Sequence, residues 1–183
     1  GLDPEFAPAP VARQAVELPL ARLLAGQPLA SAEQTSVSRY VFWTIAQLCA
    51  DHGLAFDLMI GAIRGVYPAG VAGGQDLFDR RNSLAQYLPL FNAFPRVSFP
   101  VSIIDSSGNP ELVTFGWILP NVYPAGHWWY SNIPALIEPD LRARLQAVPR
   151  TKLIGYYSDM YMLELGYPKF NMYRRCLARV LAD

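Results

Sequence analysis

The stretch KLIGYYSDMY, residues 152–161, decides which fold this chain is expected to adopt. Residues 152–157 form an apolar run rich in residues that favour β-structure, which predicts a strand buried on both faces. Ser158 and Asp159 follow that strand directly. Because the loops after the carboxyl ends of parallel strands carry the chemistry of α/β proteins, Asp159 is a candidate metal ligand or general base. The alternative is an aspartate that caps the following turn.

Alternating strands and helices are also predicted upstream and downstream of this stretch. Strands are expected over residues 54–61, 96–104 and 121–126, and helices over residues 77–91, 110–119 and 140–148 and from residue 167 onward. Four strand–helix repeats indicate a parallel sheet with right-handed crossovers. The predicted fold class is therefore α/β with parallel βα repeats. The repeats are either half of a (β/α)8 barrel, which needs about 250 residues, or a small open sheet.

Two helices are predicted ahead of the repeats. A short one covers residues 19–24. The second begins at the motif SAEQ, where Ser31 is expected to cap the helix while the Gln34 side chain reaches back to it. That helix is expected to stop near Gly53.

Length and composition describe one domain. The chain has 183 residues, of which 52% are hydrophobic and 16% are charged, which suits a substantial core and is unlike a disordered chain. We expect the domain over residues 20–183, after an extended, proline-rich lead-in over residues 7–19. Residues 1–6, GLDPEF, look like a vector remnant.

Charge and hydropathy argue against two classes of partner. Fifteen basic residues balance fifteen acidic ones and no cluster of Lys and Arg occurs, so nothing favours nucleic acid or an anionic membrane. No apolar run approaches the roughly 20 residues of a membrane helix, and the start of the chain lacks the features of a signal peptide. Cys49 and Cys176 lie far apart in predicted helices, which indicates free thiols in a reducing compartment and hence a cytoplasmic protein.

Several motifs, taken in order, resemble one known family. They are LMIGAIR at residues 58–64, NVYPAGHWWYSN at residues 121–132, KLIGYYSD at residues 152–159 and YRRCL at residues 173–177. With these motifs the chain is similar, at low identity, to the C-terminal part of uronate isomerases, which are members of the metal-dependent amidohydrolase superfamily. That family shows a tandem Trp after the seventh barrel strand and a Ser/Thr-Asp after the eighth.

The resemblance implies a fold and a set of site residues. The chain would be the C-terminal half of a TIM barrel, (β/α)8, that interconverts an aldose hexuronate and its ketose. Asp159 would bind the divalent metal, zinc or similar, and serve proton transfer. Arg64 would meet the carboxylate of the sugar-acid substrate, and Trp128 and Trp129 would line the sugar pocket.

The chain departs from the family in its histidines. The first-strand His-x-His is absent, since His52 and His127 are the only histidines and lie far apart. Met59 replaces the fifth-strand His, and a thioether does not suit a hard metal ion. His127 stands where the isomerases usually carry a small residue. A catalytic metal needs about three protein ligands, so Asp159 with at most His127 makes a poor site in this chain alone.

Each candidate residue also has a plainer explanation. His127 is a metal ligand, a catalytic acid or base, or a satisfied polar residue beside Trp128. Arg64 holds a substrate carboxylate or anchors its own loop. Trp128 and Trp129 stack against a sugar or fill the core.

Three functions remain open at this point. The chain is a fragment of an isomerase that is inactive alone, or a half-barrel binding module that is completed by self-association or by a complementary chain. The third possibility is part of a hydrolase or decarboxylase of the same superfamily, because a shared barrel does not fix the reaction.

Overall fold

The structure, a computed structural model, describes residues 6–63, 65–67, 69, 77–156, 160 and 162–183. At its centre is a parallel sheet made of β1 (Leu58–Ile60), β4 (Phe99–Ile103) and β5 (Val122–Pro124), in the order β1-β4-β5. The predicted combination of helices with parallel strands is therefore confirmed for the described part of the chain.

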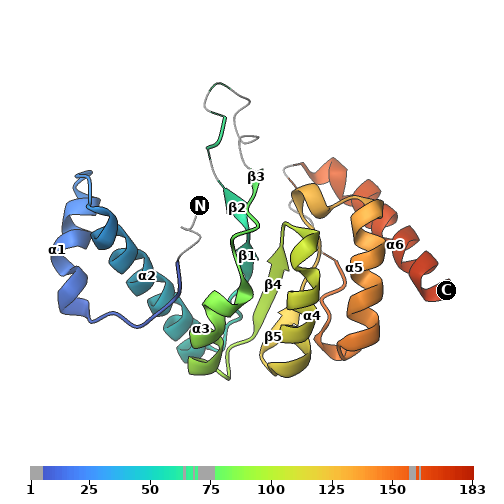
Figure 1. The fold of residues 1–183 in the computed structure, drawn as a ribbon, viewed down its shortest axis with the longest axis horizontal. Helices are drawn as coiled ribbons and strands as arrows, with labels where there is room; N and C mark the ends of the chain where they lie inside the picture. Colours follow the sequence, from blue (N-terminus) through green and yellow to red (C-terminus); the bar gives the residue numbers. More distant parts are fainter. Residues whose placement is uncertain (1–5, 64, 68, 70–76, 157–159, 161) are drawn as a thin grey trace.

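The remaining elements surround this sheet (Figure 1). The α-helices of the described residues are α1 (Arg13–Leu24), α2 (Ser31–His52), α3 (Leu88–Ala93), α4 (Asn109–Ile118), α5 (Pro134–Ala147) and α6 (Gly166–Ala182). Two short strands, β2 (Ala62–Ile63) and β3 (Leu77–Phe78), pair in antiparallel fashion and lie above the parallel sheet in Figure 1. Within the described residues, no helix combines the length and apolar character needed to cross a membrane.

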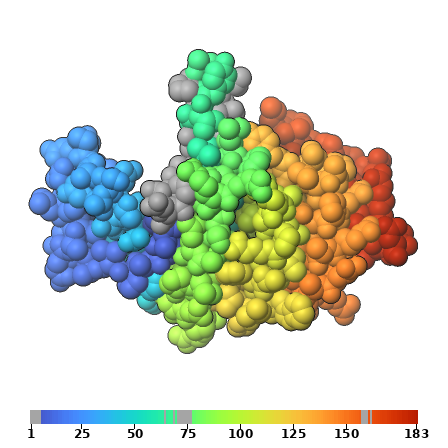
Figure 2. Space-filling view, in the orientation of Figure 1, coloured from blue at the N-terminus to red at the C-terminus, as the bar shows by residue number. Residues whose placement is uncertain are grey.

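The first two helices form an arm that projects from the body of the molecule (Figure 2). The start of the described chain is packed against this arm. The ring of Phe6 lies edge-on to Phe42 of α2 at 5.6 Å between centroids, and Arg39 Nε donates a hydrogen bond to the carbonyl oxygen of Ala7 at 3.0 Å.

The main core lies between the parallel sheet and the helices on one of its faces. Alternate strand residues point to that face, where they meet buried side chains of α2, α3 and α4. The strands contribute Leu58, Ile60, Phe99, Val101, Ile103 and Val122 to this core. The helices contribute Ala46, Cys49, Leu90, Phe91 and Leu112, among others. A second, smaller cluster joins α5 to α6 and contains Ile137, Leu141, Tyr173, Cys176 and Val180. Both cysteines are buried free thiols.

The opposite face of the sheet is incompletely covered by the described residues. It carries Met59, Pro100, Ser102 and Tyr123, which pair across the strands as Met59 with Ser102 and Pro100 with Tyr123. Ser102 is buried, but Met59 is 44% exposed and the other two are only half-buried. Parallel sheets are normally covered on both faces, so an exposed methionine in the middle of β1 is unusual.

The strand predicted over residues 54–61 is shorter than expected. The amide of Phe56 donates to the carbonyl oxygen of Ser98 at 2.9 Å, so Pro100, two residues further on, also faces β1. Because Pro100 has no N–H to donate, the ladder loses a hydrogen bond there, and β1 begins only at Leu58.

The strand predicted over residues 152–157 is wrong for residues 152–156, which the structure describes. A short 3-10 turn, Arg150–Lys152, leads into an irregular segment. The amide of Ile154 donates to the carbonyl oxygen of Pro124 at 3.0 Å, so the segment does lie beside β5. Tyr156, however, stacks on an aromatic ring of α6 at 4.5 Å between centroids. The segment is therefore held by its side chains rather than by a regular ladder.

The helix predicted over residues 77–91 is wrong in its first half. Leu77–Phe78 form β3, and the Asp79 carboxylate then accepts a hydrogen bond from the amide of Arg81 at 3.0 Å. Such a local side-chain bond competes with helix formation. The α-helix itself, α3, covers only Leu88–Ala93.

Two helices begin earlier than predicted because each buries a residue in its first turns. The extended lead-in over residues 7–19 ends at the start of α1, in which Val16 is 1% exposed. Similarly, α5 begins at Pro134 rather than at residue 140 and fully buries Ile137. Burial of these side chains outweighs the cost of Pro19 and Pro139 inside the helices.

The boundaries of α2 were predicted well, but its cap was not. The capping residue is Ala30 rather than Ser31, and the Glu33 carboxylate, not Gln34, accepts a hydrogen bond from its amide at 2.9 Å. Gly53 ends the helix in the left-handed conformation with φ 65°, as expected for a C-terminal glycine. The predicted strands around β4 and β5 and the predicted helices around α4 and α6 are confirmed.

We predict that Gly116→Ala destabilises the fold, because α4 approaches β5 too closely for a methyl group. A Cβ at Gly116 would lie 2.5 Å from Pro124 Cγ. We expect the free energy of unfolding, measured by urea denaturation, to fall by about 1–3 kcal/mol. Gly155→Ala is the matched control, since its Cβ would meet the Tyr173 hydroxyl at an ordinary 3.4 Å. Equal stability of the two variants would contradict this account of the α4–β5 contact.

Candidate functional site

The carboxyl ends of β1, β4 and β5 lie at one edge of the sheet because these strands are parallel. Gly61 follows β1, Asp105 comes shortly after β4, and His127 and Trp128 come shortly after β5. In open or closed parallel sheets, this edge is where binding and catalytic groups gather. The candidate site therefore consists of residues at and just behind this edge.

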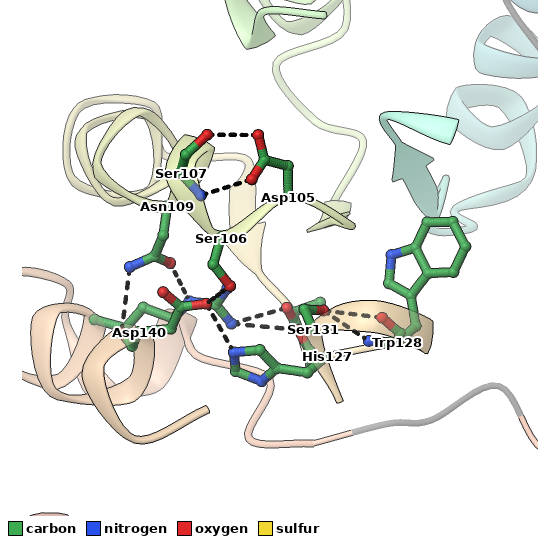
Figure 3. A network of polar contacts seen from close by, with 11 residues as sticks. Asp105, Ser106, Ser107, Asn109, His127, Trp128, Ser131 and Asp140 are labelled. Atoms are coloured by element: carbon green, nitrogen blue, oxygen red, sulfur yellow. Dashed lines mark hydrogen bonds and ion pairs between the residues drawn. The ribbon is translucent and has the colours of Figure 1, made fainter. Parts of the chain in front are cut away.

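Asp140 of α5 is the centre of a buried polar network behind this edge (Figure 3). Its Oδ2 accepts a hydrogen bond from the Ser106 hydroxyl at 2.8 Å and lies 3.2 Å from His127 Nε2. Its backbone carbonyl oxygen accepts a weaker bond, 3.4 Å long, from the side-chain nitrogen Nδ2 of Asn109. Asp140 thereby joins α5 to the turns that follow β4 and β5.

Arg144, one helical turn after Asp140, holds the chain at the end of β5. Its guanidinium donates to the carbonyl oxygens of Ala125 at 3.0 Å and Gly126 at 3.3 Å, and to Asn109 Oδ1 at 2.8 Å. The residue is only 3% exposed. A buried guanidinium is tolerated only when its donors are satisfied, and here they fix the backbone directly before His127.

His127 is a neutral imidazole within this network. A carboxylate only accepts hydrogen bonds, so Nε2 carries the proton that faces Asp140 and Nδ1 is left as the acceptor. Burial lowers the pKa of His127 below its ordinary value, which outweighs the opposing effect of the bond to Asp140. Nδ1 is buried and has no hydrogen-bond partner among the described residues.

Trp128 points away from His127. Figure 3 shows the indole and the imidazole on opposite sides of the backbone. Both residues are 1% exposed, and the indole Nε1 also has no hydrogen-bond partner in the described part of the chain. The Ser131 hydroxyl accepts from the amide of Trp128 at 3.3 Å and donates to its carbonyl oxygen at 2.9 Å, which fixes the turn.

Trp129 has an uncommon backbone conformation, with φ 50°. Bulky residues rarely adopt this left-handed region, and such strain often marks functional segments. The Trp129 ring stacks in parallel on Tyr130, with the centroids 5.5 Å apart and the planes 5° apart. The two rings form a partly exposed aromatic surface beside the end of β5.

Two of the residues proposed from the sequence lie outside the described residues. These are Arg64, the candidate for the substrate carboxylate, and Asp159, the candidate metal ligand and base. Among the described candidates, the structure brings His127 together with Asp140 of α5. It does not bring the His127 imidazole together with the Trp128 indole.

The described residues do not provide a metal site. No group of three or more His, Cys, Asp or Glu side chains that could hold a metal ion occurs among them. The imidazole of His127 is already bonded to Asp140, and Met59 offers a thioether where a hard cation needs oxygen or nitrogen. The chain as described therefore does not fit a divalent metal.

A cavity of about 260 Å³ lies at the same edge, at the ends of β1 and β4. Its walls come from Gly61, from Asp105 and Ser107 after β4, from Glu111 of α4, and from the segment that contains Asp79 and Arg80; Ile60 and Ile103, the last residues of the two strands, line it as well.

Neither the Asp140 network nor this cavity was predicted from the sequence. Asp105 directly follows the strand predicted over residues 96–104, just as Asp159 closely follows the strand predicted over residues 152–157. That position was the available signal. Nothing in the sequence pattern distinguishes Asp140 or Arg144 from exposed charges on a helix, because their burial depends on how α5 packs.

Comparison with known proteins relates the chain to uronate isomerases. No protein-family profile matches it. The uronate isomerase of Thermotoga petrophila (strain RKU-1) is 22% identical over 169 residues, which cover 88% of this chain and 38% of that protein. The chain thus spans well under half the length of the curated relatives it matches.

Solved structures give the same relationship. The uronate isomerase of Bacillus halodurans C-125 superposes with a TM-score of 0.71 and 26% identity, over 78% of this chain and 34% of that one. The uronate isomerase of Thermotoga maritima gives 0.83 and 20%, over 96% and 40%. The glucuronate isomerase of Caulobacter crescentus gives 0.77 and 19%, over 98% and 40%. In sequence and fold, the chain resembles part of a uronate isomerase.

We predict that His127 makes the fold less stable in mild acid. The pKa of His127 is lowered in the folded state, so below about pH 6.5 the unfolded chain binds a proton that the folded chain does not. Stability should therefore fall by up to about 1.4 kcal/mol per pH unit below that point. Urea denaturation between pH 7.5 and about 5 should show a smaller loss for His127→Gln. The exposed His52 provides the control variant His52→Gln, and a loss unchanged in His127→Gln would contradict the assignment.

We also predict that Arg144→Met destabilises the chain by about 2–4 kcal/mol, since it leaves buried carbonyl oxygens and Asn109 Oδ1 without their donor. Arg142→Met on the same helix is the control. Its side chain is 45% exposed and pairs with Asp183 at the surface, so its loss should change stability by only about 0.5 kcal/mol. Thermal and urea denaturation measure both. Similar losses in the two variants would argue against a special role for Arg144.

Proposed function

We propose that this chain is part of a uronate-isomerase-like enzyme and forms the C-terminal half of its (β/α)8 barrel. The observation that carries the proposal is the likeness to uronate isomerases in both sequence and fold, along nearly the whole chain. That likeness supports an isomerase-like function, the interconversion of an aldose hexuronate and its ketose.

The face of the sheet that the described residues leave partly uncovered supports an incomplete barrel. In a closed barrel the residues that alternate with the helix-facing ones point to the interior, which is the position of Met59 and Tyr123. In the complete barrel, interior side chains from other strands would cover Met59, which is exposed in the structure of this chain.

The proposed roles follow the ends of the strands. Asp159 would move the proton between adjacent carbons of the sugar and contribute to a divalent metal site, whose remaining ligands would come from the other half of the barrel. Arg64 would hold the substrate carboxylate through a bidentate pair. Trp128 and Trp129 would line the sugar pocket, to which their aromatic rings are suited.

His127 is better suited to support than to catalysis. Its imidazole is buried and hydrogen-bonded to Asp140, on the side of the backbone away from Trp128. We propose that it positions the turn that carries Trp128, in place of the direct acid–base role that the sequence also allowed.

A second candidate function is an assembly module. Exposed apolar residues recur at three-to-four spacing on α2, where Val41, Ile45 and Leu48 are 39–50% exposed. Together with the open sheet face, such a stripe favours a partner surface. Light scattering separates the two proposals: a stable complex of defined size formed by this chain alone favours assembly, and a monomer argues against self-association.

We predict that the purified 183-residue chain does not convert D-glucuronate to its ketose, with or without added zinc, because no complete set of metal ligands occurs among its described residues. A ketose-specific assay measures this. Turnover by this chain, lost in Asp159→Asn, would contradict the fragment proposal.

A longer protein that contains this chain provides the positive test. There we expect turnover, which Asp159→Asn should reduce by about 10²-fold or more. Arg64→Met should mainly raise KM for the sugar acid. A longer protein that hydrolyses or decarboxylates its substrate instead would retain the barrel but reject the isomerase.

A further inference from the structure

Trp129 has a backbone conformation that its surroundings must hold in place. Among the described residues it is the one residue other than glycine with a positive φ, 50°. A bulky side chain in this left-handed region is strained, and such a conformation persists only where neighbouring contacts determine it. The contacts of the turn over residues 128–132 therefore decide where the Trp129 ring lies.

Asn132 links this turn to a second segment of the chain. Its amide donates a hydrogen bond to the carbonyl oxygen of Trp129 at 3.0 Å. Its side-chain oxygen Oδ1 accepts a hydrogen bond from the hydroxyl of Tyr156 at 2.7 Å, 24 residues further along the chain. Asn132 thus bonds both to the strained backbone and to a side chain distant in sequence.

Tyr156 is suited to be the fixed end of this link because α6 holds its ring. The ring stacks on Tyr173, with the centroids 4.5 Å apart and the planes 12° apart. It also lies edge-on to Phe170, at 5.0 Å between centroids. Tyr173 is buried in the cluster that joins α5 to α6. Two aromatic contacts on a buried anchor leave the hydroxyl little freedom to move away from Asn132.

Packing alone does not require the hydroxyl of Tyr156. A phenylalanine at this position would keep both ring contacts and would bury no polar atom. What the hydroxyl adds is the bond to the turn that carries Trp129. Removing the hydroxyl and keeping the ring therefore separates a positioning role from a packing role.

We propose that Tyr156 is a positioning residue, which holds the Trp129 ring in place through Asn132. The proposal rests on the proposed function for its consequence, since Trp129 would there line the sugar pocket. The bonds of Ser131 act on the backbone of Trp128, whereas the link from Tyr156 acts on the strained residue that follows it.

NMR spectroscopy of the 183-residue chain tests the positioning directly. The chain has four tryptophans, and single Trp→Phe variants assign their indole N–H signals. In Tyr156→Phe we expect the Trp129 signal to shift or broaden, because the turn loses its link to α6. The signals of Trp43 in α2 and Trp117 in α4 should stay unchanged and serve as internal references.

Further variants identify the bond that is responsible. Asn132→Leu should change the Trp129 signal as Tyr156→Phe does, and combining the two changes should add little, because both remove the same bond. Asn132→Asp keeps an acceptor oxygen and should leave the signal closer to that of the original chain than Asn132→Leu does. Tyr40→Phe removes the hydroxyl from another half-buried tyrosine, in α2, and is the matched control that should leave Trp129 unchanged.

Three results would overturn the proposal. The first is a Trp129 signal that Tyr156→Phe leaves unchanged. The second is a set of changes that add up fully in the combined variant. The third is an equal change in all four indole signals, which would mean that the hydroxyl of Tyr156 stabilises the fold in general.

The longer protein shows whether the positioning matters for the substrate. There, Tyr156→Phe should raise KM for the sugar acid about three- to tenfold, as expected for the loss of one hydrogen bond, and should change kcat less than about twofold. A merely structural loss would lower the amount of folded enzyme, and with it the apparent kcat, at constant KM. That pattern would contradict the positioning role.

The two proposals fail separately. A Trp129 signal that depends on Tyr156, in a longer protein without isomerase activity, would reject the isomerase and retain the link between Tyr156 and Trp129. Isomerase activity in which neither KM nor the Trp129 signal responds to Tyr156→Phe would retain the enzyme and reject the role of Tyr156.

Discussion

The buried guanidinium of Arg144 is the interaction on which the carboxyl end of β5 depends. It joins the carbonyl oxygens of Ala125 and Gly126 to Asn109 of α4, while Asp140, on the same helix, joins His127 to Ser106. Strands end in loops whose backbone groups lack ladder partners, and such groups are costly to bury unless something bonds to them. Here α5 supplies the partners, so the position of the Trp128 turn follows from the packing of α5.

This dependence explains how much of the molecule could be predicted from the sequence. Periodicity located α2, α4, α6 and the strands β4 and β5, because in each case the pattern agrees with the packing. Periodicity predicted the wrong structure where a local hydrogen bond or a contact distant in sequence decided the conformation. The Asp79–Arg81 turn interrupts a helical pattern, and Tyr156 packs on α6 instead of extending a strand. The early starts of α1 and α5 were hidden by prolines and were decided by burial of Val16 and Ile137.

The same reasoning applies to the candidate site. The gathering of polar side chains at the carboxyl ends of the strands could be predicted, because it follows from parallel topology. Which side of the backbone a residue occupies could not. His127 and Trp128 are adjacent in sequence, yet the His127 imidazole faces Asp140 of α5 and the Trp128 indole lies on the opposite side of the backbone. The two side chains therefore lie in different environments, although they belong to one sequence motif. A pocket-lining role proposed from the resemblance to known enzymes suits Trp128 better than His127.

The polar groups at this edge of the sheet divide by how completely the protein satisfies them. Asp140, Arg144, Asp79 and Glu111 have short bonds within the chain, and removing a partner from such a group costs stability. Asp105 is also bonded to the amide and hydroxyl of Ser107, whereas its contact with the exposed side chain of Arg80 is 3.8 Å long, so a ligand that pairs with Arg80 has little internal energy to replace. Because recognition depends on the difference between bound and free states, a loosely paired Arg–Asp couple at a cavity is a better selector of ligands than a tightly bonded network. How completely the described residues bond to one another, more than the number of polar residues, therefore separates the groups that stabilise this edge of the sheet from those that a ligand can reach.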